Sequence, residues 1–204
     1  MSESPKFERP ETPETGDETF SLEEKAAMYL ERSQHNLEQL EKDRLTGLSN
    51  RMGFDRALER ELMLRARGGQ DCSILFIDLD NFKQVNDSKG HLEGDRVLQE
   101  VAEVLTHSIR GTDLVARFGG DEFFILLPQT DKEEALETGN KILTALNGSK
   151  ELFIGPGITA SIGISSSSLS ANATELVHFA DLAAKKAKQS GKNQVMTFEA
   201  LGEA

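Results

Sequence analysis

From residue 43 onward, hydrophobic side chains recur along the chain with two periods, one typical of helices and one typical of strands. Apolar residues three and four positions apart predict amphipathic helices, and short apolar runs between polar or glycine-rich segments predict strands. Helices are predicted over residues 51–67, 94–109, 132–146 and 174–189, and strands over 73–79, 114–118, 123–127, 158–165 and 194–198. This order predicts an α/β (α+β) fold with a mixed central sheet flanked by helices.

The chain before residue 43 is patterned differently. Residues 1–20 are rich in Pro, Glu, Thr and Ser and offer little apolar surface to bury, so we expect a disordered acidic tail. Its threonines stand among acidic residues and could be phosphorylated and then bound by an arginine-lined partner, although a solvated tail is the simpler interpretation. These threonines are Thr12, Thr15 and Thr19.

Residues 21–42 are predicted to form an N-terminal helix. The sequence Ser21-Leu22-Glu23-Glu24 has the form of a capping box. Positions at heptad spacing then follow, namely Ala26, Leu30, Ser33, Leu37 and Leu40. The run is short for a coiled coil, so two interpretations stay open: a stalk that dimerises, or a helix packed on the following domain. We therefore expect three parts, a tail over 1–20, a helix over 21–42 for dimerisation or partner docking, and a larger folded domain over 43–204.

Charge and composition narrow the classes of function. The 204 residues carry a formal net charge of -12 at pH 7, which disfavours sequence-independent nucleic-acid binding. The single cysteine, Cys72, excludes an intramolecular disulfide and a cysteine-ligated metal cluster. No signal peptide and no apolar run of membrane-spanning length is visible. We expect a cytoplasmic protein that binds neither nucleic acid nor a membrane.

Acidic residues mark the ends of two predicted strands. Asp78 closes an apolar strand and Asp80 follows it, while Asp121 and Glu122 stand at the tip of a predicted hairpin. If the strands are neighbours, Asp78 and Asp121 meet at one edge of the sheet, where their carboxylates repel each other unless a cation intervenes. An oxygen site of this kind suits Mg2+, which is usually held by one or two carboxylates together with substrate phosphates.

The glycines of the hairpin and the start of a helix favour a phosphate-bearing ligand. Gly119 and Gly120 allow unusual backbone angles and the close approach of a ligand. The turn at residues 81–83 opens a helix whose free N–H groups could hold phosphate oxygens. Because the chain has no GxxxxGK[ST] segment and no Rossmann glycine pattern, a nucleotide enzyme built on it must use the metal and the hairpin.

Four motifs in order resemble the GGDEF domain, the diguanylate cyclase family, from about residue 43 to residue 198. The segment 43–51 is similar to the DxLTGLxNR motif of that family, and the segment 76–87 is similar to its FxDxDxFKxxND motif. Gly90-His91 and Gly94-Asp95 match the GHxxGD pattern, and 117–123 contains the signature itself. The resemblance implies a palm-like mixed sheet, as in nucleotidyl cyclases.

The resemblance also implies the catalytic residues. Asp78 and Asp121 would bind Mg2+ together with the carbonyl of Leu79, with two ions in each site and Mn2+ as an alternative. Glu122 would assist at the second metal ion or help to deprotonate the attacking 3′-hydroxyl group. The ions would polarise the α-phosphate and neutralise developing charge.

Substrate contacts are implied in the same way. Asn86 and Asp95 would hydrogen-bond the guanine edge, which favours GTP over ATP because adenine lacks the matching donors. The β- and γ-phosphates would be held by backbone amides near Phe82 and Lys83 and by Lys188, beside Gly119 and Gly120.

Arg110 and Asp113 form an RxxD pattern at the position where this family binds its product as an inhibitor. The local alternative is a charged, solvated turn between a helix and a strand. The chain departs from the family pattern in its C-terminal segment, where Lys185 replaces a Tyr and Lys192 an Arg. Lysine keeps the charge of arginine and loses its planar fork, so phosphate contacts are expected to be weaker.

The sequence thus predicts a diguanylate cyclase that condenses two GTP molecules into cyclic di-GMP and two pyrophosphates across a homodimer, with product inhibition. Each subunit would hold one GTP. A regulatory protein could dock on the N-terminal tail or helix. The alternatives are a non-catalytic cyclic di-GMP receptor and a scaffold that works through the N-terminal helix.

Overall fold

The computed structural model describes residues 21–149, 158–199 and 202, and only the backbone for residues 33–38. The predicted tail over 1–20, with its threonines, lies outside the described residues. The chain divides into two compact units at Leu40/Glu41, close to the boundary expected between helix and catalytic domain. Within the described ranges, no helix has the length and apolar character needed to cross a bilayer.

The first unit contains helix α1, which spans Leu22–Leu40. Its predicted capping box is confirmed: the Ser21 amide donates to the Glu24 carboxylate at 2.7 Å, and the Glu24 amide donates to the Ser21 hydroxyl at 3.2 Å. These bonds satisfy two backbone donors that a helix start leaves without an intrahelical acceptor. The predicted helix is therefore present and begins where the sequence places it.

The second unit is built on a five-stranded sheet with the order β2-β3-β1-β4-β5. The pairs β2–β3, β3–β1 and β1–β4 are antiparallel, and the pair β4–β5 is parallel. The strands are β1 (Ser73–Asp80), β2 (Leu114–Gly119), β3 (Glu122–Leu127), β4 (Thr159–Ser166) and β5 (Gln194–Thr197). This topology confirms the mixed sheet expected from the sequence.

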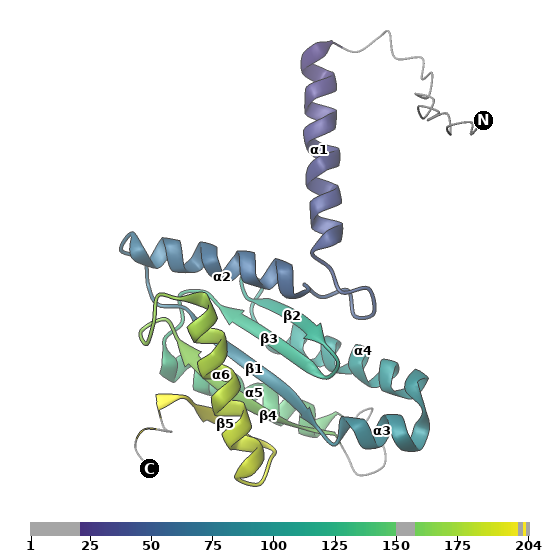
Figure 1. The fold of residues 1–204 in the computed structure, drawn as a ribbon, viewed down its shortest axis with the longest axis vertical. Coiled ribbons are helices and arrows are strands. Elements are labelled where there is room, and N and C mark those ends of the chain that lie inside the picture. Colours follow the sequence, from purple (N-terminus) through teal and green to yellow (C-terminus); the bar gives the residue numbers. More distant parts are fainter. Residues whose placement is uncertain (1–20, 150–157, 200–201, 203–204) are drawn as a thin grey trace, which may run out of the picture. The chain divides into compact units, whose positions relative to one another are not determined.

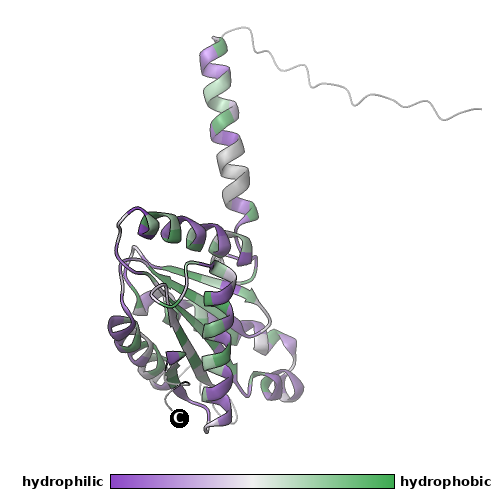
Figure 2. Cartoon of the chain, turned by 60° about the vertical axis from the view of Figure 1, so that its left-hand side comes forward, coloured by the Kyte–Doolittle hydropathy of each residue, from purple (hydrophilic) through white to green (hydrophobic). Residues whose placement is uncertain are grey.

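Helices cover both faces of the sheet (Figure 1). One face packs against α2 (Arg51–Ala66) and α6 (Ala173–Gln189), and the other carries α3 (Phe82–Lys89), α4 (His91–Ser108) and α5 (Lys132–Gly148). Figure 2 shows the strands as a largely hydrophobic layer between helices with hydrophilic outer surfaces. Because side chains alternate along a strand, β1, β2 and β3 each contribute to two separate apolar cores.

The region between β1 and β2 differs from the prediction in one respect. The sequence predicts a helix that opens at residues 81–83 and another over 94–109, and the structure has both, but the second begins at His91, directly after Gly90. Gly90 has φ 86°, a value that residues with a Cβ rarely adopt, so the chain can change direction there. The apolar spacing alone did not reveal how closely the two helices follow each other, and both bury residues in the same core.

Gly163 determines how closely α6 approaches the sheet. A Cβ atom at this position would lie 2.0 Å from the Ala180 carbonyl oxygen and 2.3 Å from the Ala184 amide nitrogen. The small residues Ala180, Ala183 and Ala184 of α6 are fully buried against β4. This contact fixes the depth of α6 and therefore the position of the lysines in its last turn.

We expect Gly163→Ala to destabilise the domain by about 1–3 kcal/mol, because the added methyl group must displace the α6 backbone. Chemical denaturation monitored by circular dichroism measures the loss. Gly148→Ala is the matched control, since a Cβ there meets no atom within 4 Å. Equal stabilities of the two variants would contradict this account of α6 packing.

Candidate functional site

The edge of the sheet at the β2–β3 turn brings the predicted acidic residues together. The register between β1 and β3 sets Asp78 directly opposite Glu122. Asp121 occupies the turn between β2 and β3, where its carbonyl accepts a hydrogen bond from the Leu79 amide at 3.3 Å. The expectation that Asp78 and Asp121 meet at one sheet edge is thus confirmed at the level of the backbone.

The conformation of the hairpin turn depends on its two glycines and on Arg117. Gly119 and Gly120 have φ values of 143° and 55°, which favour residues without a Cβ. The Arg117 guanidinium donates to the Gly120 carbonyl from Nε at 3.1 Å and from a terminal nitrogen at 2.9 Å. The same guanidinium reaches Asp43 at 3.1 Å, so the first residue of the 43–51 motif clamps the turn.

The 43–51 segment is held against β2 by its backbone. The Ser49 carbonyl accepts from the Arg117 amide at 2.8 Å, and the Asp43 carboxylate accepts from the amide and hydroxyl of Thr46. Burial raises the pKa of Asp43, but the hydrogen bonds from Thr46 and Arg117 outweigh it and hold the pKa below its usual value. The sequence places Asp43 and Arg117 in motifs, but their contact only emerges in the fold.

Asp78 carries a largely buried carboxylate with one charged partner. The Lys188 ammonium lies 2.6 Å from its Oδ1. Burial raises the pKa of Asp78; Lys188 opposes this effect and the neighbouring carboxylates of Asp121 and Asp80 reinforce it. A largely buried carboxylate in a cluster of negative charge is suited to a cation.

The donor set fits a divalent metal ion completed by a ligand. Among the described residues, no group of three or more His, Cys, Asp or Glu side chains is arranged to hold a metal by itself. Two carboxylates and a backbone carbonyl are nevertheless sufficient for Mg2+, which usually takes its remaining ligands from water and substrate phosphates. Asp78, Asp121 and the Leu79 carbonyl could provide this set.

Glu122 lies at the exposed start of β3 in a negative field. Partial burial raises the pKa of its carboxyl group, and Asp78, Asp121 and Asp181 raise it further, while Lys188 lowers it. Asp181 comes from α6, where it pairs with Lys185 at 2.6 Å. The sequence did not single out Asp181, because only the packing of α6 brings it near the hairpin.

Asp80 has a structural role that its position in the sequence did not indicate. Asp80 is 1% exposed. Its carboxylate accepts hydrogen bonds from the hydroxyls of Thr159 and Ser161, at 2.8 and 2.9 Å, and from the backbone amide of Asn193 at 3.1 Å. Three donors satisfy this buried carboxylate. Asp80 therefore ties β1 to β4 and to the segment after α6.

The predicted guanine-binding residues lie where α3 meets α4. A Cβ at Gly94 would lie 2.0 Å from Oδ1 of Asn86, so the glycine makes room for the amide. Asp95 follows Gly94 and is exposed. The Phe82 ring belongs to the buried core beneath them, so its side chain contributes packing.

The start of α3 lies beside the segment after α6. Asn81, the N-cap of α3, has φ 65° and makes no side-chain capping hydrogen bond in the described structure. Its Oδ1 instead accepts from the Lys192 ammonium at 3.0 Å. The amides of Phe82 and Lys83 belong to the first turn of α3, and their binding of phosphate stays a prediction.

Arg110 and Asp113 lie at the opposite end of the hairpin. The Arg110 amide donates to the Asp113 carboxylate at 2.8 Å, which closes the turn. Both residues line a cavity of about 340 Å³ together with Lys141 and Glu137 of α5. Asp78, Asp121 and Glu122 do not line this cavity.

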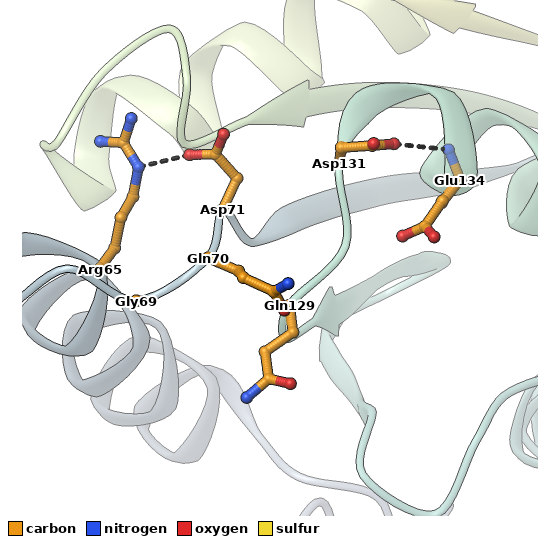
Figure 3. A pocket seen from close by; sticks show the side chains of 7 residues that line it. All are labelled: Arg65, Gly69, Gln70, Asp71, Gln129, Asp131 and Glu134. Atoms are coloured by element: carbon orange, nitrogen blue, oxygen red, sulfur yellow. Dashed lines mark hydrogen bonds and ion pairs between the residues drawn. The ribbon is translucent and has the colours of Figure 1, made fainter.

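A second cavity, of about 600 Å³, lies between the end of α2 and the start of α5. Figure 3 shows that Arg65 pairs with Asp71 and that Asp131 caps the helix start at Glu134. The contacts of these charged groups stabilise the end of α2 and the start of α5. Asp78, Asp121 and Glu122 do not line this cavity either. We therefore place the candidate active site at the end of the sheet where these acids lie.

We expect Glu122→Gln to raise the melting temperature of the metal-free chain at pH 7. A carboxyl group whose folded pKa is raised costs stability once the pH exceeds its unfolded pKa, and this cost vanishes at lower pH where both states are protonated. Thermal unfolding in EDTA from pH 7 to pH 3 measures the difference, which should shrink as the pH falls. Glu59→Gln on the exposed face of α2 is the control; a pH-independent difference for Glu122→Gln would contradict the account.

Comparison with known proteins gives matches over most of the chain. The family described as "Diguanylate cyclase, GGDEF domain" matches residues 40–194. Diguanylate cyclase DgcP of Pseudomonas aeruginosa is 34% identical over 177 residues, and diguanylate cyclase DgcM of Escherichia coli is 39% identical over 155 residues. These alignments cover 86% and 76% of this chain but 26% and 37% of the relatives, so the chain spans a minor part of their length.

Solved structures show the same architecture. Diguanylate cyclase SiaD of Pseudomonas aeruginosa, in complex with its activator SiaC, superposes with a TM-score of 0.73 at 34% identity, covering 85% of this chain and 71% of that one. The coiled coil and GGDEF domain of DgcB from Caulobacter crescentus, in complex with c-di-GMP, gives a TM-score of 0.72 at 27% identity, covering 85% and 96%. With its motifs in register and its fold shared, the chain belongs to the GGDEF-domain family.

Proposed function

We propose that the chain is a diguanylate cyclase, which joins two GTP molecules into cyclic di-GMP and releases two pyrophosphates. The observation that carries the proposal is the convergence of Asp78, Asp121 and Glu122 at one sheet edge, with Lys188 beside them. The relatives named as diguanylate cyclases support the reaction. A cytoplasmic location, where GTP is available, goes with this assignment.

GGDEF diguanylate cyclases generally use divalent metal ions. In this chain Asp78, Asp121 and the Leu79 carbonyl would hold Mg2+, with Glu122 beside a second ion and Mn2+ as an alternative. Bound there, the metal would supply positive charge to the α-phosphate and the leaving pyrophosphate. The Oδ1 atom of Asp78, which already faces the positive charge of Lys188 at 2.6 Å, supports this assignment.

Glu122 would accept the proton of the attacking 3′-hydroxyl group. Carboxylates serve as general bases, and the strand register sets Glu122 directly opposite Asp78, beside the proposed metal ion. The clamp from Arg117 to the Gly120 carbonyl keeps the turn in one conformation. Preorganisation of this kind reduces the reorganisation that the reaction requires.

Guanine recognition would come from Asn86 and Asp95. The Asn86 amide, placed by Gly94, and the exposed Asp95 carboxylate would pair with the base edge. An aspartate accepts from two guanine donors that adenine does not offer, which explains selectivity for GTP. The amides of Phe82 and Lys83, together with Lys188, would hold the β- and γ-phosphates beside Gly119 and Gly120.

Catalysis would require two copies of the chain, because each site holds one GTP and the product contains two nucleotides. Helix α1 exposes apolar side chains that a partner could cover, among them Met28, Tyr29 and Leu30. DgcB carries a coiled coil next to its GGDEF domain, which supports dimerisation through α1, and SiaD binds an activator, which supports docking of a regulatory protein.

Product inhibition would act through Arg110 and Asp113. Their cavity contains the Lys141 ammonium, which donates to the Ser108 carbonyl at 2.7 Å and adds positive charge. A guanidinium and an ammonium suit a phosphodiester, and the Asp113 carboxylate suits the donors of guanine. The structure of DgcB with c-di-GMP supports binding of this nucleotide within the family.

We expect the full chain to convert GTP into cyclic di-GMP in the presence of Mg2+, with a specific activity that rises with protein concentration as dimers form. Asp121→Asn should lower the turnover rate by roughly 100-fold or more, the scale typical of losing one charged catalytic group. Chromatography of the nucleotides measures both effects.

Glu59→Gln, an exposed substitution on α2, is the control for loss of one negative charge. Absence of cyclic di-GMP at every protein concentration, with folding intact, would exclude the cyclase and favour a receptor that binds cyclic di-GMP at Arg110 and Asp113. A scaffold acting through the N-terminal helix would remain only if neither nucleotide bound.

Arg110→Ala should raise the cyclic di-GMP concentration needed for half-inhibition by roughly 10-fold or more, because charge-assisted hydrogen bonds to phosphate are lost. Initial rates measured against added cyclic di-GMP give this value. Arg60→Ala on exposed α2 is the control and should leave the inhibition curve unchanged. An unchanged curve for Arg110→Ala would place the inhibitory site elsewhere.

A further inference from the structure

Lys188 is assigned two partners, the Asp78 carboxylate and the substrate phosphates, and the structure shows its contact with Asp78. Its ammonium lies 2.6 Å from Oδ1 of Asp78, a carboxylate proposed above as a metal ligand. The proposed function also assigns Lys188 to the substrate phosphates. A single ammonium cannot stay on Oδ1 while a divalent cation takes that oxygen, because the two positive charges repel each other.

The Asp78 carboxylate needs a cation in every state of the site. Its side chain is 19% exposed, and the Lys188 ammonium, 2.6 Å from Oδ1, supplies positive charge beside it. Asp121 and Asp80 add negative charge around it. An unpaired buried carboxylate is costly, so the Lys188 ammonium compensates this oxygen when no metal is bound.

The backbone at the end of α6 is fixed, whereas the lysine side chain can move. The Ala187 carbonyl accepts from the Lys192 amide at 3.0 Å and from the Gln194 side chain at 2.8 Å. The Ser190 amide donates to the Lys186 carbonyl at 2.9 Å. The Lys188 side chain is 34% exposed and has four rotatable carbon–carbon bonds, so it can change partners without moving the helix.

We propose that Lys188 is an exchangeable counter-ion: it neutralises Asp78 in the metal-free site and moves to the nucleotide phosphates when a divalent cation replaces it. The proposal rests on the proposed function. It makes metal and nucleotide binding cooperative, since the triphosphate offers the displaced ammonium a new partner. By thermodynamic reciprocity, the metal raises nucleotide affinity by the same factor.

Lys185 provides a matched comparison. It lies one turn earlier on α6, pairs with Asp181 at 2.6 Å, and its charge also acts on Glu122. Its carboxylate partner is not among the proposed metal ligands. Lys185→Gln therefore removes the same charge from the same region and leaves Asp78 paired.

The test measures Mn2+ binding to the full chain by the electron paramagnetic resonance signal of free Mn2+, first with no nucleotide. We expect Lys188→Gln to bind Mn2+ at least about fivefold more tightly than the wild type and Lys185→Gln, since allosteric couplings are typically roughly 5–150-fold. Affinity equal to or weaker than that of Lys185→Gln would overturn the proposal.

A second titration adds an α,β-methylene analogue of GTP, in which the bond broken by the cyclase is replaced. The analogue should tighten Mn2+ binding in the wild type and in Lys185→Gln, and by a smaller factor in Lys188→Gln. An equal factor in all three chains would overturn the exchange. If the Mn2+ affinity of the wild type is the same with and without the analogue, that result alone overturns the proposed exchange.

These outcomes separate the inference from the proposed function. If the wild type makes cyclic di-GMP and binds Mn2+ with the analogue, but Lys188→Gln matches Lys185→Gln, only the counter-ion exchange fails. If the wild type neither binds Mn2+ with the analogue nor makes product, both fail.

Discussion

The pairing of β1 with β3 is the constraint on which the candidate site depends. Its register places Asp78 opposite Glu122 and brings the Asp121 backbone to the Leu79 amide. A slip of one residue would turn the side chains of one strand to the opposite face, into the other core, where the neighbours are packed around different side chains. Burial of the two apolar cores therefore enforces the arrangement of the acids. The carboxylates repel one another and stay together because the strands that carry them are held by these cores.

Two charged side chains connect this edge to segments far away in the sequence. Arg117 joins the hairpin turn to Asp43, and Lys188 reaches Asp78 from the end of α6. The depth of α6 follows from the missing side chain at Gly163. The site is thus assembled at the meeting point of the two strands, the 43–51 segment and one helix, and each of these is positioned by packing that has no chemical part in the reaction.

Several features of the fold were accessible from the sequence for simple physical reasons. The capping box at Ser21 is a local pattern, and both of its hydrogen bonds are present. The hairpin around Gly119 and Gly120 was predicted because two apolar runs flank residues suited to positive φ. The start of α4 was placed three residues too late, because Gly90, with φ 86°, already ends α3 and lets the next helix begin at His91. The roles assigned to Asn86, Asp95, Arg110 and Asp113 from the family resemblance remain predictions.

By itself, the sequence determined the mixed sheet with its helices, the order of the four motifs and the identity of the acids at the strand ends, because these depend on local periodicity and on neighbours in the chain. Only the tertiary structure decided which acids share an environment. It removed Asp80 from the group by satisfying its carboxylate with three donors, added Asp181 to the field of Glu122, and paired Asp78 with Lys188. Burial and through-space charge set these partnerships, and neither is written in the spacing of residues along the chain.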